Sequence, residues 1–396
     1  MVLKAYRYRF YPTPALILFL AKTFGCCRFV YNYFLAAKKK HYKENKKTLS
    51  YSECSSILAE LKKVEVWLQE VSSVALQQSL RHLESAFSRF FQKKGHFPKF
   101  KKRFYEQKAS FMKNAFIFKN GELKLAKCDQ PLNIRWSRKF QGEPTSIAIT
   151  LDQQGRYYVS ILVEEFIKPL PRTHRTVGID LGLTHSITTS DGKKEKPGNF
   201  LKKQLKRLRR VQRAFSRKKK GSADAHKSRK VISKLCEKIR ERRIDYLHKK
   251  SRTLVNENQV ICVENLAVKN MMKNRRLARG IADSGWGTLI NFLKYKCVWY
   301  GRQFAQIDRY FPSSKQCFQC KKINEALTLS DRLWRCSHCN CEHDRDVTAA
   351  KNIKEEGLRL INESTVGHTG YEACGANVRP NWPSSWQFAV KQELGL

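Results

Sequence analysis

Acidic residues are scarce in this sequence. Its 396 residues include 34 Asp and Glu against 78 Lys and Arg, which gives a formal net charge of +44. A compact chain with that charge repels itself, so we expect a polyanionic partner, with nucleic acid ahead of an anionic membrane. The charge and the length together argue against a secreted disulfide mini-protein, a collagen and a simple enzyme for acidic substrates.

Long apolar runs are also missing. No stretch of 18 or more apolar residues occurs, so the sequence predicts no transmembrane helix and no membrane partner. The apolar run ALILFL near the N-terminus is short, is soon followed by charge and lacks the small-residue cleavage site of a signal peptide. At 41% hydrophobic residues the chain can still build several cores, and its length predicts two to three domains.

Cysteines are present in an odd number, thirteen, and five of them cluster between residues 317 and 341. This distribution favours a reducing compartment and a metal site over a disulfide framework. Two C-x-x-C turns separated by fifteen residues are typical of a zinc ribbon, whose closed shell of four thiolates is structural rather than catalytic. Cys341, His338 and His343 lie near enough to replace one ligand. The favoured ligands are Cys317, Cys320, Cys336 and Cys339.

The hydrophobic pattern divides the chain into helical and strand-rich stretches. Residues 2–13 alternate and indicate a strand, residues 15–92 have helical spacing, and strand-like alternation returns at 111–170. Pro169 and Pro171 indicate a domain junction. Beyond it we expect a strand pair from Thr176, two basic helices within 198–250 that break at 221–223, a strand at 259–266, a helix at 286–304, a strand at 305–311 and a helix at 346–361.

Three carboxylates lie next to these apolar segments. Asp180 and Glu264 lie at the ends of predicted strands, and Asp346 lies where a helix begins. If the three converge, their charges need neutralising, and two Mg²⁺ or Mn²⁺ ions about 3.5–4 Å apart would do so while activating water for phosphodiester cleavage. Each acid also has an ordinary alternative, as a turn cap, a partner of a nearby lysine or a helix N-cap.

Basic residues gather in three runs that also carry aromatic rings, at 38–47, 91–103 and 198–250. A single charged run is usually a solvated surface, but three such runs favour a groove that follows a nucleic-acid backbone and stacks its bases. Tyr51, Gln77 and Gln78 are candidates for reading bases, because glutamine pairs with adenine edges in a major groove. The candidate backbone contacts are Lys206, Arg207, Arg210, Arg217, Lys218 and Lys219.

Taken together, these motifs resemble the TnpB family, compact nucleases encoded by insertion sequences and related to the type V CRISPR effectors. The matching stretches include YRYRFYPT, FPKFKKR, VGIDLGL, VICVENL, FPSSKQCFQC and WRCSHCNCEHDRDVTAAKNI, in family order over nearly the whole chain. The resemblance implies a multidomain α/β fold. An RNase H-like (RuvC) nuclease domain contains an inserted zinc ribbon, and an N-terminal β-barrel, the wedge domain, is interrupted by a helical recognition lobe.

The resemblance also implies domain boundaries. The implied parts are a wedge barrel at 1–14 and 106–172, a helical recognition domain at 15–105, a first nuclease part at 173–312 that contains the basic hairpin 198–250, a zinc ribbon at 313–342, a second nuclease part at 343–361 and a loosely ordered tail at 362–396.

By family motif, Asp180, Glu264 and Asp346 match the three catalytic acids, which would hold two Mg²⁺ or Mn²⁺ ions. The segment HDRD contains two aspartates, and Asp346 rather than Asp344 fits the family pattern Asp-x-Asn-Ala. The Asn of that pattern is Thr348 here, a departure that leaves open a slightly altered site.

The activity implied by the resemblance is RNA-guided cleavage of double-stranded DNA beside a short flanking motif, with a guide RNA made from the transposon end. Base pairing would supply the long sequence information, while the protein reads heteroduplex shape and the short motif. One acid triad predicts that a single site cuts both strands in turn. We expect a monomeric protein within a ribonucleoprotein, in the cytoplasm of a prokaryote and associated with the nucleoid.

Other hypotheses remain open at this point. The chain could be an RNA-guided DNA binder that no longer cuts and acts as a repressor, or a transposase or resolvase that needs no RNA. A plain zinc-ribbon nucleic-acid binder is the fallback, although it has no need for acids at the ends of buried strands.

Overall fold

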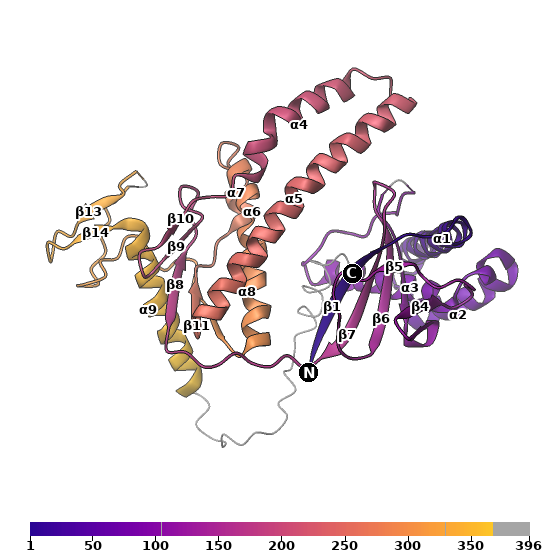
Figure 1. Ribbon diagram of the computed structural model, residues 1–396, viewed down its shortest axis with the longest axis horizontal. Coiled ribbons are helices and arrows are strands. Elements are labelled where there is room, and N and C mark those ends of the chain that lie inside the picture. Colours follow the sequence, from indigo (N-terminus) through magenta and orange to yellow (C-terminus); the bar gives the residue numbers. More distant parts are fainter. Residues whose placement is uncertain (104, 329, 367–396) are drawn as a thin grey trace. The chain divides into compact units, whose positions relative to one another are not determined.

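A computed structural model describes residues 1–396 except 104, 329 and 367–396. The described chain forms two compact units, unit 1 up to Phe166 and unit 2 from Ile167 onwards, and Figure 1 shows the elements of each. The division precedes the predicted junction prolines, Pro169 and Pro171, by a few residues. Both units mix helices with β-sheet, as the sequence predicts.

Unit 1 combines a five-stranded antiparallel sheet, in the order β2-β6-β7-β1-β5, with three α-helices. A separate two-stranded sheet pairs β3 with β4. The elements are β1 (Val2–Phe10), α1 (Pro14–Asn45), α2 (Tyr51–Val64), the 3₁₀ helix η1 (Val66–Glu70), α3 (Ser73–Phe91), β2 (Gln107–Met112), the 3₁₀ helix η2 (Lys113–Ala115), β3 (Phe116–Lys119), β4 (Glu122–Leu125), β5 (Ile134–Arg135), β6 (Pro144–Leu151) and β7 (Tyr157–Glu165).

The sequence explains where the helices of unit 1 begin. Thr13 accepts a hydrogen bond from the backbone N–H of Leu16 and Pro14 occupies the first turn of α1, where its missing N–H costs nothing. Ser50 and Glu53 form a reciprocal capping box at the start of α2. Apolar residues of these helices and of β1, β6 and β7 belong to one continuous core, so the predicted wedge and recognition segments share a core.

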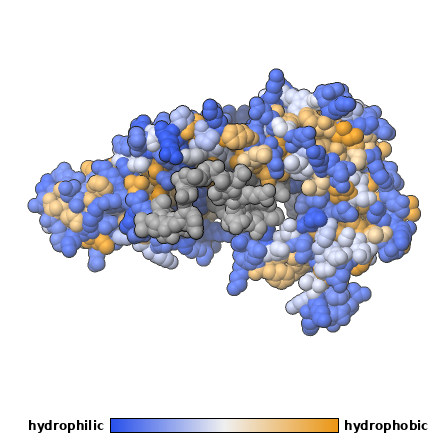
Figure 2. All heavy atoms as spheres, turned by 90° about the horizontal axis from the view of Figure 1, so that it is seen from below, coloured by the Kyte–Doolittle hydropathy of each residue, from blue (hydrophilic) through white to orange (hydrophobic). Residues whose placement is uncertain are grey.

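Helix α1 is the one described helix that is long and apolar enough to cross a membrane by length and composition, and 44% of its most apolar window is buried inside the structure. Leu20, Val30 and Phe34 of this helix are fully buried in the core of unit 1. We therefore interpret α1 as a core helix. On the face shown in Figure 2, hydrophilic side chains predominate and hydrophobic ones are scattered between them.

Unit 2 contains a five-stranded mixed sheet in the order β10-β9-β8-β11-β12. The pairs β8–β9 and β9–β10 are antiparallel, whereas β8–β11 and β11–β12 are parallel. The elements are β8 (Thr176–Asp180), β9 (Ile187–Thr189), β10 (Lys194–Glu195), α4 (Phe200–Ser216), α5 (Ala223–Glu257), β11 (Val260–Val263), α6 (Val268–Met271), α7 (Ala278–Ser284), α8 (Trp286–Tyr300), β12 (Gln303–Gln306), β13 (Leu333–Arg335), β14 (Glu342–Asp344) and α9 (Arg345–Val366).

Two glycines let α9 lie directly against this sheet. A Cβ at Gly178 of β8 would come within 2.0 Å of the carbonyl oxygen of Ala350, and a Cβ at Gly357 would come within 2.4 Å of the sulfur of Cys262 on β11. Only glycine fits such close approaches. The packing matters for function, because it fixes the start of α9 relative to the ends of β8 and β11.

The basic region folds as a helical hairpin, seen in Figure 1 as α4 followed by the longer α5. Its turn includes residues 221 and 222, where the sequence predicts the break, and Ser222 accepts a hydrogen bond from the N–H of Ala225 to begin α5. Leu208 of α4 packs with Leu235 and Ile239 of α5. The hairpin thus buries one apolar stripe and leaves most of its cations exposed.

Three sequence-based expectations in unit 2 are corrected. The helix predicted at 286–304 is α8, which already ends at Tyr300, where Gly301 takes the left-handed conformation that commonly terminates a helix. The strand predicted at 305–311 is β12, which begins and ends earlier, because parallel pairing with β11 aligns Gln303 with Val260 and Gln306 with Val263. Helix α9 continues to Val366, so the first residues of the tail that we expected to be loose, 362–366, are helical. The remainder of that tail lies outside the described residues.

Candidate active site and metal centre

Asp180 and Glu264 lie side by side at the carboxyl edge of the unit 2 sheet. Asp180 is the last residue of β8, and Glu264 directly follows β11. The two strands are parallel neighbours, and Ile179 pairs with Val263, so the next residue of each strand is an acid. This edge of a parallel pair is where α/β proteins commonly place their ligands.

Asp346 reaches the same place from the first turn of α9. Burial, and then the charges of Glu264 and Asp346, raise the pKa of Asp180 to about 7, while Arg345 opposes the shift. Burial also raises the pKa of Glu264. The three predicted acids therefore form one electrostatic cluster, in which a cation is strongly favoured.

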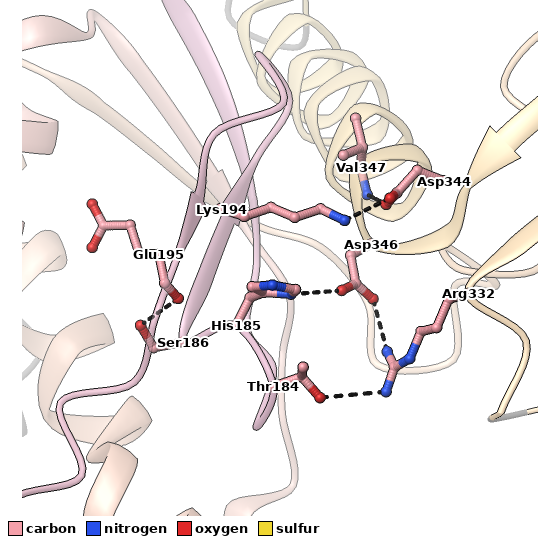
Figure 3. A network of polar contacts seen from close by, with 9 residues as sticks. All are labelled: Thr184, His185, Ser186, Lys194, Glu195, Arg332, Asp344, Asp346 and Val347. Atoms are coloured by element: carbon pink, nitrogen blue, oxygen red, sulfur yellow. Dashed lines mark hydrogen bonds and ion pairs between the residues drawn. The ribbon is translucent and has the colours of Figure 1, made fainter.

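Asp346 is held by two basic side chains, drawn in Figure 3. Nδ1 of His185 lies 3.4 Å from its Oδ2, and a guanidinium nitrogen of Arg332 donates to its Oδ1 at 3.2 Å. The other terminal nitrogen of Arg332 lies 3.5 Å from the hydroxyl of Thr184. Neither His185 nor Arg332 is among the site residues predicted from the sequence. His185 lies five residues after Asp180, so its nearness in sequence could have pointed to it. Arg332 belongs to the ribbon, and no local pattern connects it to Asp346.

The neighbouring acid, Asp344, has a different environment. One of its oxygens accepts a hydrogen bond from the N–H of Val347 at 3.1 Å, as an N-terminal cap of α9, and the other binds Lys194 at 2.5 Å. Lys194 and these hydrogen bonds hold the pKa of Asp344 below its usual range despite burial. This contrast supports the choice of Asp346 as the third member of the acid cluster.

The donor set of the acid cluster suits Mg²⁺ or Mn²⁺, because carboxylate oxygens are the ligands that hard divalent ions prefer. Buried carboxylates at strand ends with a raised pKa are costly without a cation. Their oxygens are nevertheless not gathered as tightly as the thiols described next. Among the described residues, the only metal-type group with all ligand atoms within 4.8 Å of one another consists of cysteines.

Four sulfur atoms form that group, from Cys317, Cys320, Cys336 and Cys339. The sulfur of Cys317 lies 3.5 Å from that of Cys339, and the sulfur of Cys320 lies 3.6 Å from that of Cys336. A tetrahedron with Zn–S bonds of about 2.3 Å has edges of about 3.8 Å, so the group fits a structural Zn²⁺ site. Cys341, one of the possible substitutes, is outside the group, and His343 contributes only a 3.0 Å contact from Nε2 to the sulfur of Cys317.

The pKa values of two of these thiols move in opposite directions. Backbone N–H groups of Cys339 and His338 lower the pKa of Cys336 to about 6, whereas burial raises that of Cys317 to about 12. Zn²⁺ binds thiolates, so a bound ion would favour deprotonation of both.

The ribbon is fastened to α9. Asn352, buried within α9, donates from Nδ2 to the carbonyl oxygens of Ser313 and Gln316 at 2.8 and 2.7 Å, just before the first cysteine. Arg345 donates to the carbonyl oxygen of Thr328 at 2.8 Å. These contacts hold the ribbon, and with it Arg332, against the helix that begins beside Asp346.

Comparisons with known families agree with this layout. Three family descriptions match: "Helix-turn-helix domain" at residues 1–47, "Probable transposase" at 157–275 and "Cas12f1-like, TNB domain" at 286–353. The first description does not fit the local structure, because residues 1–47, all described, contain one strand and the single unbroken helix α1. The third spans the ribbon and the start of α9.

Relatives over the full length decide the family. A Streptomyces pristinaespiralis protein named "Putative RNA-guided DNA endonuclease" is 43% identical over 99% of this chain and 96% of its own length. The Escherichia coli (strain K12) protein "Putative RNA-guided DNA endonuclease InsQ" is 30% identical over 96% of each chain. The chain belongs to the TnpB family. The fold of this TnpB-family chain also resembles a protein in the "Cryo-EM structure of the Cas12f1-sgRNA-target DNA complex", with a TM-score of 0.54 over 86% of this chain and 83% of that one, at 16% identity.

The nucleic-acid candidates of this TnpB-family chain lie in both units. In unit 1, Gln77 is exposed on α3, Gln78 is half-buried beside it, and the half-buried Tyr51 ring has the Arg81 guanidinium 4.8 Å from its centre. In unit 2, the predicted cations are all exposed on α4 and in the turn that follows it; they are Lys206, Arg207, Arg210, Arg217, Lys218 and Lys219.

Proposed function

We propose that this chain is an RNA-guided, metal-dependent endonuclease that cleaves double-stranded DNA beside a short flanking motif, with a guide RNA made from the transposon end. The observation that carries the proposal is the convergence of Asp180, Glu264 and Asp346 at one sheet edge, in a chain with a net charge of +44. Acids at that edge repel a polyanion unless cations bind there, so their presence indicates chemistry rather than simple binding.

The proposed nuclease domain is RNase H-like. Support comes from the strand order β10-β9-β8-β11-β12, with three antiparallel strands followed by two parallel ones, and from the acids at the ends of the two central parallel strands. The four-cysteine ribbon would be the insertion before the last acid. In unit 1, the sheet that contains β1, β6 and β7 would form part of the wedge barrel, and α1 to α3 would form the recognition lobe.

Two Mg²⁺ or Mn²⁺ ions, when bound, would supply an activated water and stabilise the leaving oxygen of the phosphodiester. The chain's own residues would hold the groups around that chemistry. Because the pKa of Asp180 is about 7, its carboxyl group would lose its proton when a cation binds. His185 orients Asp346, and the Arg332 guanidinium lies where it can also stabilise negative charge on a phosphate.

The proposed partners are a guide RNA and a target duplex. The exposed cations of the α4–α5 hairpin would contact phosphates of the guide–target duplex, and Tyr51, Gln77 and Gln78 would read the flanking motif. A single acid cluster would cut the two strands in turn. We further propose a monomeric protein in a ribonucleoprotein, acting in the cytoplasm of a prokaryote near the nucleoid.

The test is to express the chain with a transposon-end RNA, sequence the RNA that copurifies, and challenge the complex with a plasmid library that carries a matching target and random flanking bases. We expect Mg²⁺-dependent double-strand cleavage beside one short motif, and none with Asp180→Ala. Binding of the target without cleavage would favour the repressor, and joining of DNA ends without bound RNA would favour a transposase. Cleavage that survives Asp180→Ala would contradict the proposed site.

A further inference from the structure

Unit 1 carries a cluster of phenylalanine rings at its surface, which we name the aromatic strip: Phe87, Phe90, Phe91, Phe97 and Phe100. Phe87 is buried, but Phe91, Phe97 and Phe100 are 66%, 41% and 50% exposed. The Phe97 ring packs edge-on against Phe87 and Phe90, with centroids 5.6 and 5.2 Å apart. A cluster of exposed rings on one surface indicates a binding site more than a chance arrangement.

The strip is held firmly in place. Asn32 of α1 accepts a hydrogen bond from the backbone N–H of Lys101 at 2.8 Å and donates to its carbonyl oxygen at 3.0 Å, and the Lys101 ammonium lies 4.0 Å from the centre of the Tyr31 ring. Pro98, between Phe97 and Phe100, is buried. The segment after α3 is therefore fixed along α1, and its rings face outward from a supported backbone.

Positive charge accompanies the rings. Residues 92–103 contain six Lys and Arg and no acid. The ammonium of Lys39 lies 5.2 Å from the centre of Phe97 and 4.7 Å from that of Phe100. No carboxylate partner of Lys39 is found within the described part of the chain. Exposed flat rings with unpaired cations beside them are the combination that binds single-stranded nucleic acid, since a ring stacks on a base and a cation pairs with its phosphate.

We propose that the aromatic strip binds an unpaired segment of RNA, by stacking bases on Phe97 and Phe100 while Lys39 contacts the backbone. Paired bases are already stacked on their neighbours, so the rings need unpaired ones. The choice of RNA rests on the proposed function. In an RNA-guided particle the RNA is bound before any DNA strand is opened, and it is the polyanion that can cover exposed rings in the resting state.

The test uses the full chain and a fluorescent 20-nucleotide oligouridylate RNA, with binding measured by anisotropy at two salt concentrations. The double variant Phe97→Leu with Phe100→Leu should weaken binding about 5-fold or more. The slope of log affinity against log salt concentration, the salt slope, should stay unchanged, because stacking releases no counterions. Phe97→Tyr with Phe100→Tyr should bind as the wild type does. Lys39→Gln should reduce the salt slope by about one phosphate contact. Phe166→Leu, an exposed phenylalanine outside the strip, should have no effect.

Contact is checked separately by photocrosslinking a 5-iodouridine version of the same RNA, with crosslinks expected at Phe97 and Phe100. Wild-type affinity of the leucine pair, or the absence of any crosslink at Phe97 and Phe100, would overturn the proposal. It would also be overturned if the leucine pair kept its affinity for RNA while the RNA-loaded complex lost affinity for target DNA. The proposed function is tested by cleavage alone, so loss of RNA binding in the leucine pair supports the strip even in a chain that does not cut.

Discussion

Two sets of metal-type ligands lie in unit 2, and they differ in how completely each is assembled. The four ribbon sulfurs lie within 4.8 Å of one another, at distances that fit a tetrahedral ion. The three carboxylates share one sheet edge and interact electrostatically, but their oxygens do not form such a tight group. Thiols can approach one another while protonated and uncharged, whereas carboxylates at neutral pH are charged and repel.

The residues around the two sites differ in kind, apolar at the ribbon and basic at the acid cluster. The ribbon has its own small core, including Leu327 and Trp334 packed against the cysteines, and is suited to a permanent ion. At the acid cluster, Arg332 and His185 take up the charge of Asp346. Such contacts are exchangeable, so we expect this site to take and release divalent ions while the ribbon keeps its zinc.

Outside the acid cluster itself, the largest effect is expected from breaking the ribbon. Cys336→Ser should remove the bound zinc and lower DNA cleavage by roughly 10²-fold or more, because a structural zinc contributes folding energy directly. RNA binding through unit 1 should persist. Cys341→Ser is the matched control and should leave both zinc content, measured by atomic absorption, and cleavage unchanged. Zinc loss in that control would show that the ligand set is wrong.

A smaller effect is expected at Arg332, which connects the two sites. Arg332→Gln should slow cleavage by about 10- to 100-fold, because the charged side chain that we propose as a donor to the reacting phosphate is removed. Zinc content and target binding should stay at wild-type levels. Arg335→Gln is the control on the same ribbon, where the arginine is exposed and pairs with Glu342. If both variants cut equally well in single-turnover assays, Arg332 has no role in the reaction.

The burial of Asp180 and its repulsion by the neighbouring acids predict that the stability of the protein depends on pH. The folded pKa of Asp180 is about 7 against an ordinary value of 3.8, so the folded chain keeps a proton that the unfolded chain releases between these values. The stability of the metal-free protein should therefore fall as pH rises through this window and level off above pH 7. In EDTA, Asp180→Asn should melt a few degrees above the wild type at pH 8, with a difference that shrinks towards pH 4.

Calorimetric scans at several pH values measure this difference, and Mg²⁺ should stabilise the wild type but not the Asn variant at pH 8. A difference in Tm that stays constant from pH 4 to pH 8 would contradict the assigned burial and repulsion.

The smallest effect is expected at Thr348, which departs from the family pattern. Thr348 is only 3% exposed and lies two residues after Asp346 on α9, so the two side chains face different sides of the helix. Thr348→Asn should therefore change the cleavage rate by no more than about 3-fold. A gain of tenfold or more in the same assay would mean that this substitution limits the natural activity.

Much of the site was accessible from sequence, for a physical reason. A carboxylate that follows a run such as Val260–Val263 is conspicuous because charge is rare beside buried strands, and the spacing of two C-x-x-C turns is itself a geometric constraint. The pairing of Ile179 with Val263 then brings Asp180 beside Glu264, which spacing alone does not establish.

What sequence could not supply depends on tertiary contacts. Arg332 reaches Asp346 because Asn352 and Arg345 fasten the ribbon to α9, and no local periodicity encodes such contacts. The early start of β12 follows from its pairing with β11. The extension of α9 to Val366 was missed because the sequence from Asn362 onwards shows little apolar periodicity, which is the signal that predicts a helix.

The central claim is that Asp346, and not its neighbour Asp344, completes the cutting site. The direct test is to load Asp346→Asn and Asp344→Asn with the same guide RNA and to measure cleavage of a matched plasmid in Mg²⁺. We predict no detectable cleavage by Asp346→Asn with RNA and target binding intact. Asp344→Asn should still cut, although it melts at a lower temperature because it loses the ion pair with Lys194. Cleavage by Asp346→Asn at a wild-type rate, or its loss only in Asp344→Asn, would contradict the account.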